Sequence, residues 1–249
     1  MSFAEFALLA LAAVGAGAIN ALAGGGSILT FPALIAAGLP PISANVTNTV
    51  ALFPGYIGGV IGQARDLKGQ SRRLWVLAPA ALVGGLAGGL LILASSEKLF
   101  ASLVPWLLIG GCALLGVQDH IRAALQRRSG VLGIGWAIVP VLLAAVYGGY
   151  FGAGLSVIFL AVLGLTLDDS LTRLNGLKQA LALCANFAAM LLFLGSGKLV
   201  WSAALVMAVG ALIGGALGGR LASVISPKAL RAIVIAIGVG VAILFLVRR

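Results

Sequence analysis

Long apolar stretches recur along the whole chain and are separated by short segments that hold most of the charged residues. Eight of these stretches have about 17 to 21 residues, the length that a helix needs to cross the hydrocarbon core of a bilayer. They are residues 4–22, 47–63, 74–94, 99–117, 132–150, 174–194, 199–219 and 228–247. This pattern predicts an all-α polytopic membrane protein, because the strands of a membrane β-barrel would alternate apolar and polar residues.

Two further apolar stretches are shorter, residues 27–39 and 155–167. As a helix, each would extend about 20 Å, which is less than the roughly 30 Å of the hydrocarbon core. Each follows a glycine-rich interruption, Gly24-Gly25-Gly26-Ser27 in the first half and Gly152-Ala153-Gly154 in the second. We therefore expect two short re-entrant or broken helices, inside segments 24–46 and 151–173.

The two interruptions belong to an internal repeat. Sequence markers recur in the same order 127 to 130 residues apart: Gly26 as Gly154, Phe31 as Phe159, Asn48 as Asn175, and Gly84–Gly89 as Gly214–Gly219. The repeat predicts one integral membrane domain with two halves, residues 1–130 and 131–249, each with four spans and one short broken segment. Four crossings per half would leave the two copies in the same orientation, whereas five would invert the second copy. Both possibilities stay open at this point.

The composition agrees with membrane insertion and changes how the positive charge is interpreted. The 249 residues are 61% hydrophobic and only 9% charged, with a mean hydropathy of +1.17, whereas a soluble domain carries more surface charge. The net charge of +10 comes mainly from loops between spans, where basic residues set topology, so we do not expect nucleic-acid binding. Basic residues cluster at 65–73 and 122–128, two spans apart. Both loops, and with them both termini, are predicted to be cytoplasmic.

A few polar side chains inside the apolar spans are candidates for a substrate site, because intramembrane polar and charged groups are usually functional. In the helix entered through Thr172, Asn175 and Gln179 share one face and Lys178 lies at its edge. Amides donate hydrogen bonds and a lysine supplies positive charge, a combination suited to a small anion. Alternatively, the lysine reaches the membrane interface and the amides only bridge helices. Arg173, nearer the helix end, is either an entrance charge or an interface anchor.

The first half supplies neutral donors to the same predicted site. Asn45 and Asn48 lie on one face of the matching helix, and Asn20 lies near the end of the first span. The glycine breaks contribute a second kind of donor, since a helix that starts inside the membrane directs backbone N–H groups and a positive dipole end towards an anion. The residues concerned are Gly25, Gly26, Ser27, Gly152 and Gly154. The alternative is a tight turn that only requires glycine.

The residues at these breaks resemble the two signatures of a known family. Residues 19–27 (INALAGGGS), followed by Phe31-Pro32 and by residues 44–49 (ANVTNT), are similar to the first-half signature of the TauE/SafE sulfite and sulfonate exporters, also called the toluene-sulfonate uptake permease (TSUP) family. Residues 148–154 (GGYFGAG) with residues 174–178 (LNGLK) resemble its second-half signature. The resemblance implies a transporter of the bacterial inner (plasma) membrane that exports small sulfur-containing or organic anions, such as sulfite, sulfoacetate or a related sulfonate.

We therefore expect a secondary transporter that binds its anion between the two repeats, near the bilayer midplane, and exposes it alternately to each side. An anion-selective channel is the alternative, because the same donors would also suit a continuous pore. The sequence contains no nucleotide-binding motif and no cluster of metal ligands, so we expect no cofactor, no metal and no enzymatic activity. The expected partners are the small anion and the lipid bilayer, and a homo-oligomer is left open.

Overall fold

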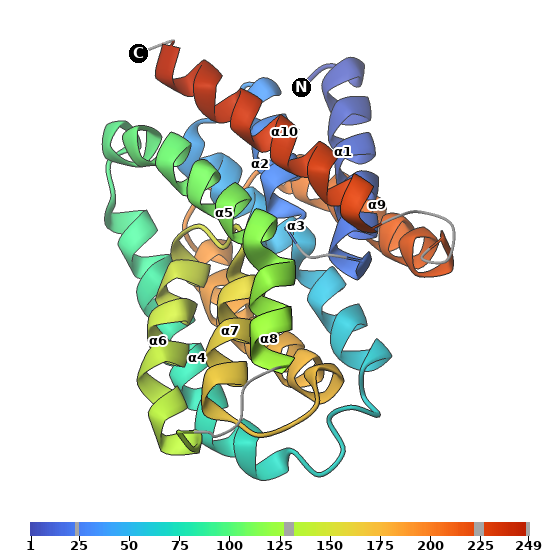
Figure 1. Cartoon of the computed structure of the whole chain (residues 1–249). Helices are drawn as coiled ribbons and strands as arrows, with labels where there is room; N and C mark the ends of the chain where they lie inside the picture. The colour runs from blue at the N-terminus through green and yellow to red at the C-terminus, as the bar shows by residue number, and fades with distance from the viewer. Residues whose placement is uncertain (23–24, 127–131, 222–226, 248–249) are drawn as a thin grey trace.

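The computed structural model describes residues 1–22, 25–126, 132–221 and 227–247 (Figure 1). Within these ranges the chain is helical and forms no strand. The described helices are α1 (Phe3–Leu22), α2 (Ser27–Ala36), α3 (Pro41–Gly62), α4 (Ser71–Ala94), α5 (Glu97–Gln126), α6 (Ile134–Tyr150), α7 (Leu155–Thr166), α8 (Leu171–Leu194), α9 (Trp201–Leu221) and α10 (Pro227–Val247). The predicted all-α class is confirmed for the described part of the chain.

Four of these helices are long and apolar enough to cross a membrane over their described residues. They are α1 over Phe3–Asn20, together with α4, α5 and α8. The structure is thus consistent with a polytopic membrane protein, while the count of eight spans stays a prediction. The two predicted short segments are helices of 10 and 12 residues, α2 and α7.

Both short helices begin at a turn whose backbone requires glycine. Gly25 has a φ of 97°, and Gly152 and Gly154 have φ values of 79° and 77°. This left-handed region is open to glycine at little cost and strained for most other residues. The turns therefore reverse the chain after α1 and after α6, and each short helix packs back against the helix that precedes it.

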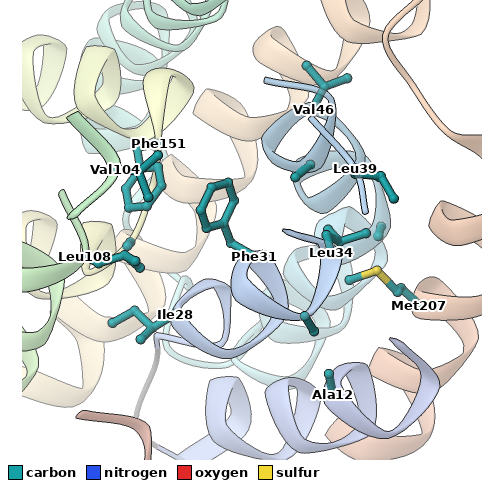
Figure 2. Close-up of a cluster of buried hydrophobic side chains, with 14 of the residues drawn as sticks. Ala12, Ile28, Phe31, Leu34, Leu39, Val46, Val104, Leu108, Phe151 and Met207 are labelled. Carbon is teal, nitrogen blue, oxygen red and sulfur yellow. The ribbon is translucent and has the colours of Figure 1, made fainter. Parts of the chain in front are cut away.

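Helix α2 is held inside the protein. Ile28, Phe31 and Leu34 are fully or almost fully buried in a cluster that α5, α9 and the α6–α7 turn also line (Figure 2). The Phe31 ring meets Phe151 edge to face, with ring centroids 5.3 Å apart. A short helix whose ends lie at membrane depth needs such a protein environment, because lipid cannot satisfy its terminal backbone groups.

The glycine motifs bring helices from the two halves into close contact. A Cβ added at Gly214 of α9 would lie 1.9 Å from the main-chain oxygen of Val14 of α1. A Cβ at Gly88 of α4 would lie 2.1 Å from the main-chain oxygen of Val146 of α6. These positions tolerate no side chain, which confirms the packing role expected for glycine pairs in membrane helices.

The helix pairs follow a regular scheme. Helix α1 runs parallel to α9, and α4 runs parallel to α6, as the order of their contacts shows. Helices α3 and α8 pack antiparallel: Gly59 approaches Gln179, and Gln63, near the end of α3, is bonded to Asn175, near the start of α8. Helices α5 and α10 also pack against each other, with an ion pair of 2.9 Å between Asp119 and Arg231.

The start of α1 and the last described turns of α10 lie at the end of the molecule opposite the α3–α4 loop (Figure 1). Helix α9 starts beside the first turns of α3, where the Val200 N–H donates to Thr47 Oγ1 at 3.1 Å, and α1 starts at the same end because it runs parallel to α9. The start of α1 thus lies at the end of the molecule opposite the loop at 65–73, whereas the sequence placed both termini on the side of that loop. The side of the membrane that each end faces stays a prediction. Helix α2 and the segment after it return the chain to the end where α1 began.

Candidate functional site

A cavity of about 140 Å³ lies between helices from both halves of the chain. Helices α1 and α3 contribute residues from the first half, and α7, α8 and α9 contribute residues from the second. The lining residues are Gly17, Asn20, Leu52, Gly55, Tyr56, Gly59, Ser156, Lys178, Gln179, Ala211 and Gly215. Among these described residues there is no acidic side chain, and Lys178 is the one charged group.

Lys178 lies in the second turn of α8 and is only 7% exposed. Its ammonium donates a hydrogen bond to Asn175 Oδ1 at 2.6 Å, and Asn175 Nδ2 donates in turn to Gln63 Oε1 at 2.6 Å. The ion pairs of the described residues do not include Lys178. A buried cation that no carboxylate neutralises favours an anionic ligand.

Asn20 is oriented by the first glycine break. Its Oδ1 accepts a hydrogen bond from the Gly26 N–H at 2.8 Å, so its NH₂ group is the end that remains for the cavity. The same bond ties the tip of α1 to the start of α2. A Cβ at Gly26 would lie 2.7 Å from the main-chain oxygen of Ala16, so this position has no room for a side chain.

Other donors complete the lining. Ser156 of α7 and Gln179 of α8, the latter next to Gly59, add a hydroxyl and an amide to the lining, whereas the Tyr56 hydroxyl of α3 is hydrogen-bonded to Asn186. A Cβ at Gly59 would lie 2.5 Å from Gln179 Nε2, so glycine at this position makes room for the amide. Taken with Asn20 and Lys178, these groups offer several hydrogen-bond donors and one positive charge around a small space, an arrangement that suits an oxyanion.

The glycine turns themselves contribute fewer free N–H groups than the sequence predicts. At the start of α2, the Ile28 N–H donates to the Gly25 carbonyl and the Leu29 N–H to the Gly26 carbonyl. The Gly26 N–H donates to Asn20 Oδ1. At the start of α7, the Val157 N–H donates to the Gly154 carbonyl at 2.9 Å. The local turn bonds therefore already use most of the donors that an anion would need there.

The structure brings together only part of the predicted site. Asn20, Lys178 and Gln179 line the cavity, and Asn175 and Gly26 are hydrogen-bonded to lining residues. The remaining predicted residues lie outside the lining: Gly25, Ser27, Gly152 and Gly154 at the two turns, Asn45 and Asn48 nearer the start of α3, and Arg173 at the start of α8.

Arg173 belongs to an ion-pair network at the end of the molecule that carries the α3–α4 and α7–α8 loops. Its Nε donates to Asp169 at 3.0 Å and its Nη1 to the Lys68 main-chain oxygen at 3.0 Å, while Arg73 also pairs with Asp169. Burial tends to raise the pKa of Asp169, but the hydrogen bonds from Arg73 and Arg173 outweigh it and leave that pKa below its ordinary value. The network links Lys68 and Arg73 of the first half to Asp169 and Arg173 of the second half.

Sequence reasoning missed several lining residues. Leu52, Gly55 and Gly59 follow Asn48 on one face of α3 at helical spacing, so extending that polar face would have found them. Gly17, Ala211 and Gly215 carry no such signal, because small residues in a packed helix pair look alike whether or not they border a cavity.

Comparisons with known proteins agree with the membrane fold and the predicted family. The family model described as "Sulfite exporter TauE/SafE" matches residues 9–245. The chain is 28% identical to a "Probable membrane transporter protein" of Haemophilus influenzae, over 82% of this chain and 79% of that protein. It is 25% identical to "Probable membrane transporter protein ORF9" of Sinorhizobium sp, over 98% of this chain and 93% of that protein.

A further relative has a similar description. The chain is 28% identical to "Probable membrane transporter protein YfcA" of Escherichia coli K12, over 88% of this chain and 81% of that protein. No solved structure matches the chain significantly. Since the family model covers nearly all of the helices described above, the chain belongs to the TauE/SafE family of membrane transporters.

Proposed function

We propose that this transporter binds a small anion in the cavity beside Lys178 and carries it across the membrane by alternating access. The observation that supports this most directly is a cation without an ion-pair partner in a cavity whose other described lining residues are neutral, among them the donors Asn20 and Gln179. Lys178 supplies the charge, the amides and hydroxyls bind anion oxygens, and Asn175 positions the ammonium. The cavity lies between the halves, where a substrate would be exposed first to one side and then to the other.

The size of the cavity favours a particular class of anion. Its volume of about 140 Å³ is well below the roughly 300 to 1,000 Å³ of sites for drug-sized ligands. Sulfite or a short organosulfonate such as sulfoacetate fits this scale better than an aromatic sulfonate does. Export as the direction of transport rests on the description of the family, "Sulfite exporter TauE/SafE".

The architecture of the proposed transporter is an inverted repeat of residues 1–130 and 131–249. Helices α1 to α5 would correspond to α6 to α10, and the helix pairs agree with this: α1 against α9 corresponds to α6 against α4, and α3 meets its own counterpart α8. Because α3 and α8 run antiparallel, the axis that relates the copies would lie in the membrane plane. Such a repeat gives the two ends of the molecule related structures, as alternating access requires.

The inner (plasma) membrane is the proposed location, and loop charge gives the orientation. Arg65, Lys68, Arg72 and Arg73 lie in or next to the α3–α4 loop, and this concentration of basic residues favours the cytoplasmic side for that end. Both termini would then face the opposite side, in line with their place in the fold. The cavity surfaces described here do not require a partner subunit, so the proposal applies equally to a monomer and to a homo-oligomer.

Flux measurements in proteoliposomes test the role of Lys178. Lys178→Ala is expected to abolish saturable sulfite flux, because it removes the one charge among the described lining residues. Lys98→Ala is the matched control, since Lys98 is exposed at the start of α5 and lies outside the cavity. Unchanged flux and affinity in Lys178→Ala would remove Lys178 from the site. Counterflow separates the carrier from the alternative, because an anion-selective channel shows no trans-stimulation and conducts measurable current.

A further inference from the structure

Two side-chain oxygens on α3 are buried without a hydrogen-bond partner among the described residues. They are Oδ1 of Asn45 and Oδ1 of Asn48, in residues that are 1% and 2% exposed. Buried amide oxygens are nearly always bonded in folded proteins, and each exception calls for an explanation such as an ion or an ordered water. These two exceptions lie three residues apart, so their Cβ atoms are neighbours, about 5 to 6 Å apart on the helix surface.

The surroundings fix the direction of the first amide. Asn45 Nδ2 donates to the main-chain oxygen of Tyr150 at 3.0 Å, so Oδ1 is the end of the amide without a partner. The nearby hydroxyl of Thr49 donates to the Asn45 main-chain oxygen at 3.1 Å and is therefore already used. Tyr150 is the last residue of α6, next to the interrupted segment that leads to α7. Unwound segments of this kind supply the backbone carbonyls that bind cations in other membrane transporters.

The chemistry of this group of oxygens points to a monovalent cation. Amide oxygens such as these two are hard ligands without formal charge, which suit an alkali ion. Within the described ranges, no three His, Cys, Asp or Glu side chains come together to hold a more strongly bound metal.

The position next to the anion cavity gives such an ion a role. Leu52, which lines the cavity, follows Asn48 by four residues on the same helix face, a rise of about 6 Å. Lys178 alone balances one negative charge, so a doubly charged oxyanion needs a second positive charge that the lining does not supply. Opposite charges this close stabilise each other strongly when water is largely excluded.

We propose that Asn45 Oδ1 and Asn48 Oδ1 form part of a binding site for an alkali cation, Na⁺ or K⁺, whose occupancy raises the affinity of the neighbouring cavity for its anion. The effect on anion affinity rests on the proposed transport function, whereas cation binding itself does not. Since linkage is reciprocal, the anion raises the affinity for the cation by the same factor. The two ions then move together in the same direction, so an outward gradient of the cation would drive the proposed export and an inward gradient would drive uptake.

Binding measurements on the purified full-length protein test this in two steps. First, sulfite affinity is measured by calorimetry in sodium chloride, potassium chloride and choline chloride. One alkali salt is expected to strengthen binding by about tenfold over choline, within the usual range of coupling between sites. Second, direct binding of radioactive sodium and rubidium, the latter in place of potassium, identifies which ion is held.

Variants assign the effect to α3. Asn48→Leu removes the oxygen at similar volume and is expected to abolish both the salt dependence and alkali-ion binding. Asn48→Asp retains an oxygen ligand and is expected to keep alkali-ion binding, and it serves as the informative variant if Asn48→Leu does not fold. Lys178→Ala is expected to lose sulfite binding but still bind the cation.

The outcomes separate this proposal from the proposed function. Equal sulfite affinity in all three salts, with no alkali-ion binding by the wild type, would overturn the cation site and leave the anion site standing; an ordered water would then satisfy the two oxygens. Alkali-ion binding that Asn48→Leu retains would also overturn the assignment. Cation binding that depends on Asn48, with no sulfite binding in any salt, would support the cation site and contradict the proposed function.

Discussion

The ammonium of Lys178 is bonded to the side-chain oxygen of Asn175, one turn earlier on α8, at 2.6 Å. This bond uses the acceptor end of the Asn175 amide, and the donor end bonds Gln63 at the end of α3. The Lys178 ammonium in the second half of the chain is therefore linked, through Asn175, to Gln63 at the end of α3 in the first half. A movement of α3 relative to α8 would change the position of the ammonium, which couples the binding site to the contact between the halves.

Gln63→Leu tests this coupling. The variant leaves the Asn175 amide without its acceptor, and sulfite affinity is expected to fall about fivefold, the equivalent of one hydrogen bond of roughly 1 kcal/mol. Gln126→Leu is the control, because Gln126 is exposed at the end of α5. Calorimetric titration of both variants makes the comparison, and an unchanged affinity in Gln63→Leu would show that Asn175 holds Lys178 without help from α3.

Gly59→Ala tests the size of the cavity. The added methyl group would lie 2.5 Å from Gln179 Nε2 and push that amide into the cavity. Sulfoacetate transport is expected to suffer more than sulfite transport, with a difference on the order of tenfold in kcat/KM, because one extra methyl group typically has this effect in a close-fitting site.

The neighbouring glycine supplies a matched control. A Cβ at Gly58 meets no atom within 4 Å, so Gly58→Ala is expected to leave transport of both anions unchanged. Initial rates in proteoliposomes over a range of substrate concentrations give the comparison. Equal losses for the two anions in Gly59→Ala would mean that this face of the cavity does not limit substrate size.

Gly214→Ala tests the close packing of α1 against α9. The new Cβ would meet the Val14 main-chain oxygen at 1.9 Å, and backbone cannot move aside as a flexible side chain does. Overpacking of this kind costs about 1 to 3 kcal/mol, so the melting temperature in detergent is expected to fall. Gly240→Ala, where the Cβ meets nothing within 4 Å, is expected to melt like the wild type. A variant of Gly214 as stable as that control would contradict the packing described here.

The sequence predicts the polar side chains of the candidate site better than it predicts which other residues surround them. Lys178, Gln179 and Asn20 were found because polar groups are costly in apolar spans, a signal that each residue carries by itself. Arg173 gives the same signal, but its partner Asp169 and the Lys68 carbonyl lie on loops whose positions depend on the whole fold. Its place in an ion-pair network could not be deduced from spacing alone.

The orientation of the termini shows a second limit. The lengths and starts of α2 and α7 follow from local signals, since a glycine turn ends one helix and a short apolar stretch forms the next. Whether such a helix returns the chain to its starting side depends on what it packs against. The cluster around Phe31 that encloses α2 is assembled from α5, α9 and the α6–α7 turn, all distant in sequence.

The Asp169 network predicts a dependence of stability on pH. The pKa of Asp169 in the folded protein is below its ordinary value of 3.8, so its pairing with Arg73 and Arg173 stabilises the fold fully above that value and is lost as the pH falls through the lower, folded one. Asp169→Asn is expected to be less stable than the wild type at pH 7 by about 1 kcal/mol, as for partly exposed ion pairs.

The pH series gives this prediction its own control. The gap in melting temperature between Asp169→Asn and the wild type is expected to close below the folded pKa of Asp169, where the carboxylate is protonated in both states. Asp168→Asn is the matched variant, because the Arg73 guanidinium bonds the main-chain oxygen of Asp168 and not its carboxylate. A gap that stays constant down to the most acidic pH tested would mean that charge at Asp169 does not contribute.

The two ends of the molecule are predicted to face opposite sides of the membrane. Ser2 precedes α1 at one end, and Lys68 lies in the α3–α4 loop at the other; both are exposed. In a background in which Cys112 and Cys184 are replaced by alanine, a membrane-impermeant maleimide is expected to label Lys68→Cys only in inverted vesicles and Ser2→Cys only in right-side-out vesicles.

A third variant, Lys98→Cys at the start of α5, should behave like Ser2→Cys, because the C-terminal turns of α10 and the start of α5 line one groove at that end. Labelling of Ser2→Cys and Lys68→Cys from the same side would rule out the return of the chain through α2, and with it the antiparallel relation of the two halves.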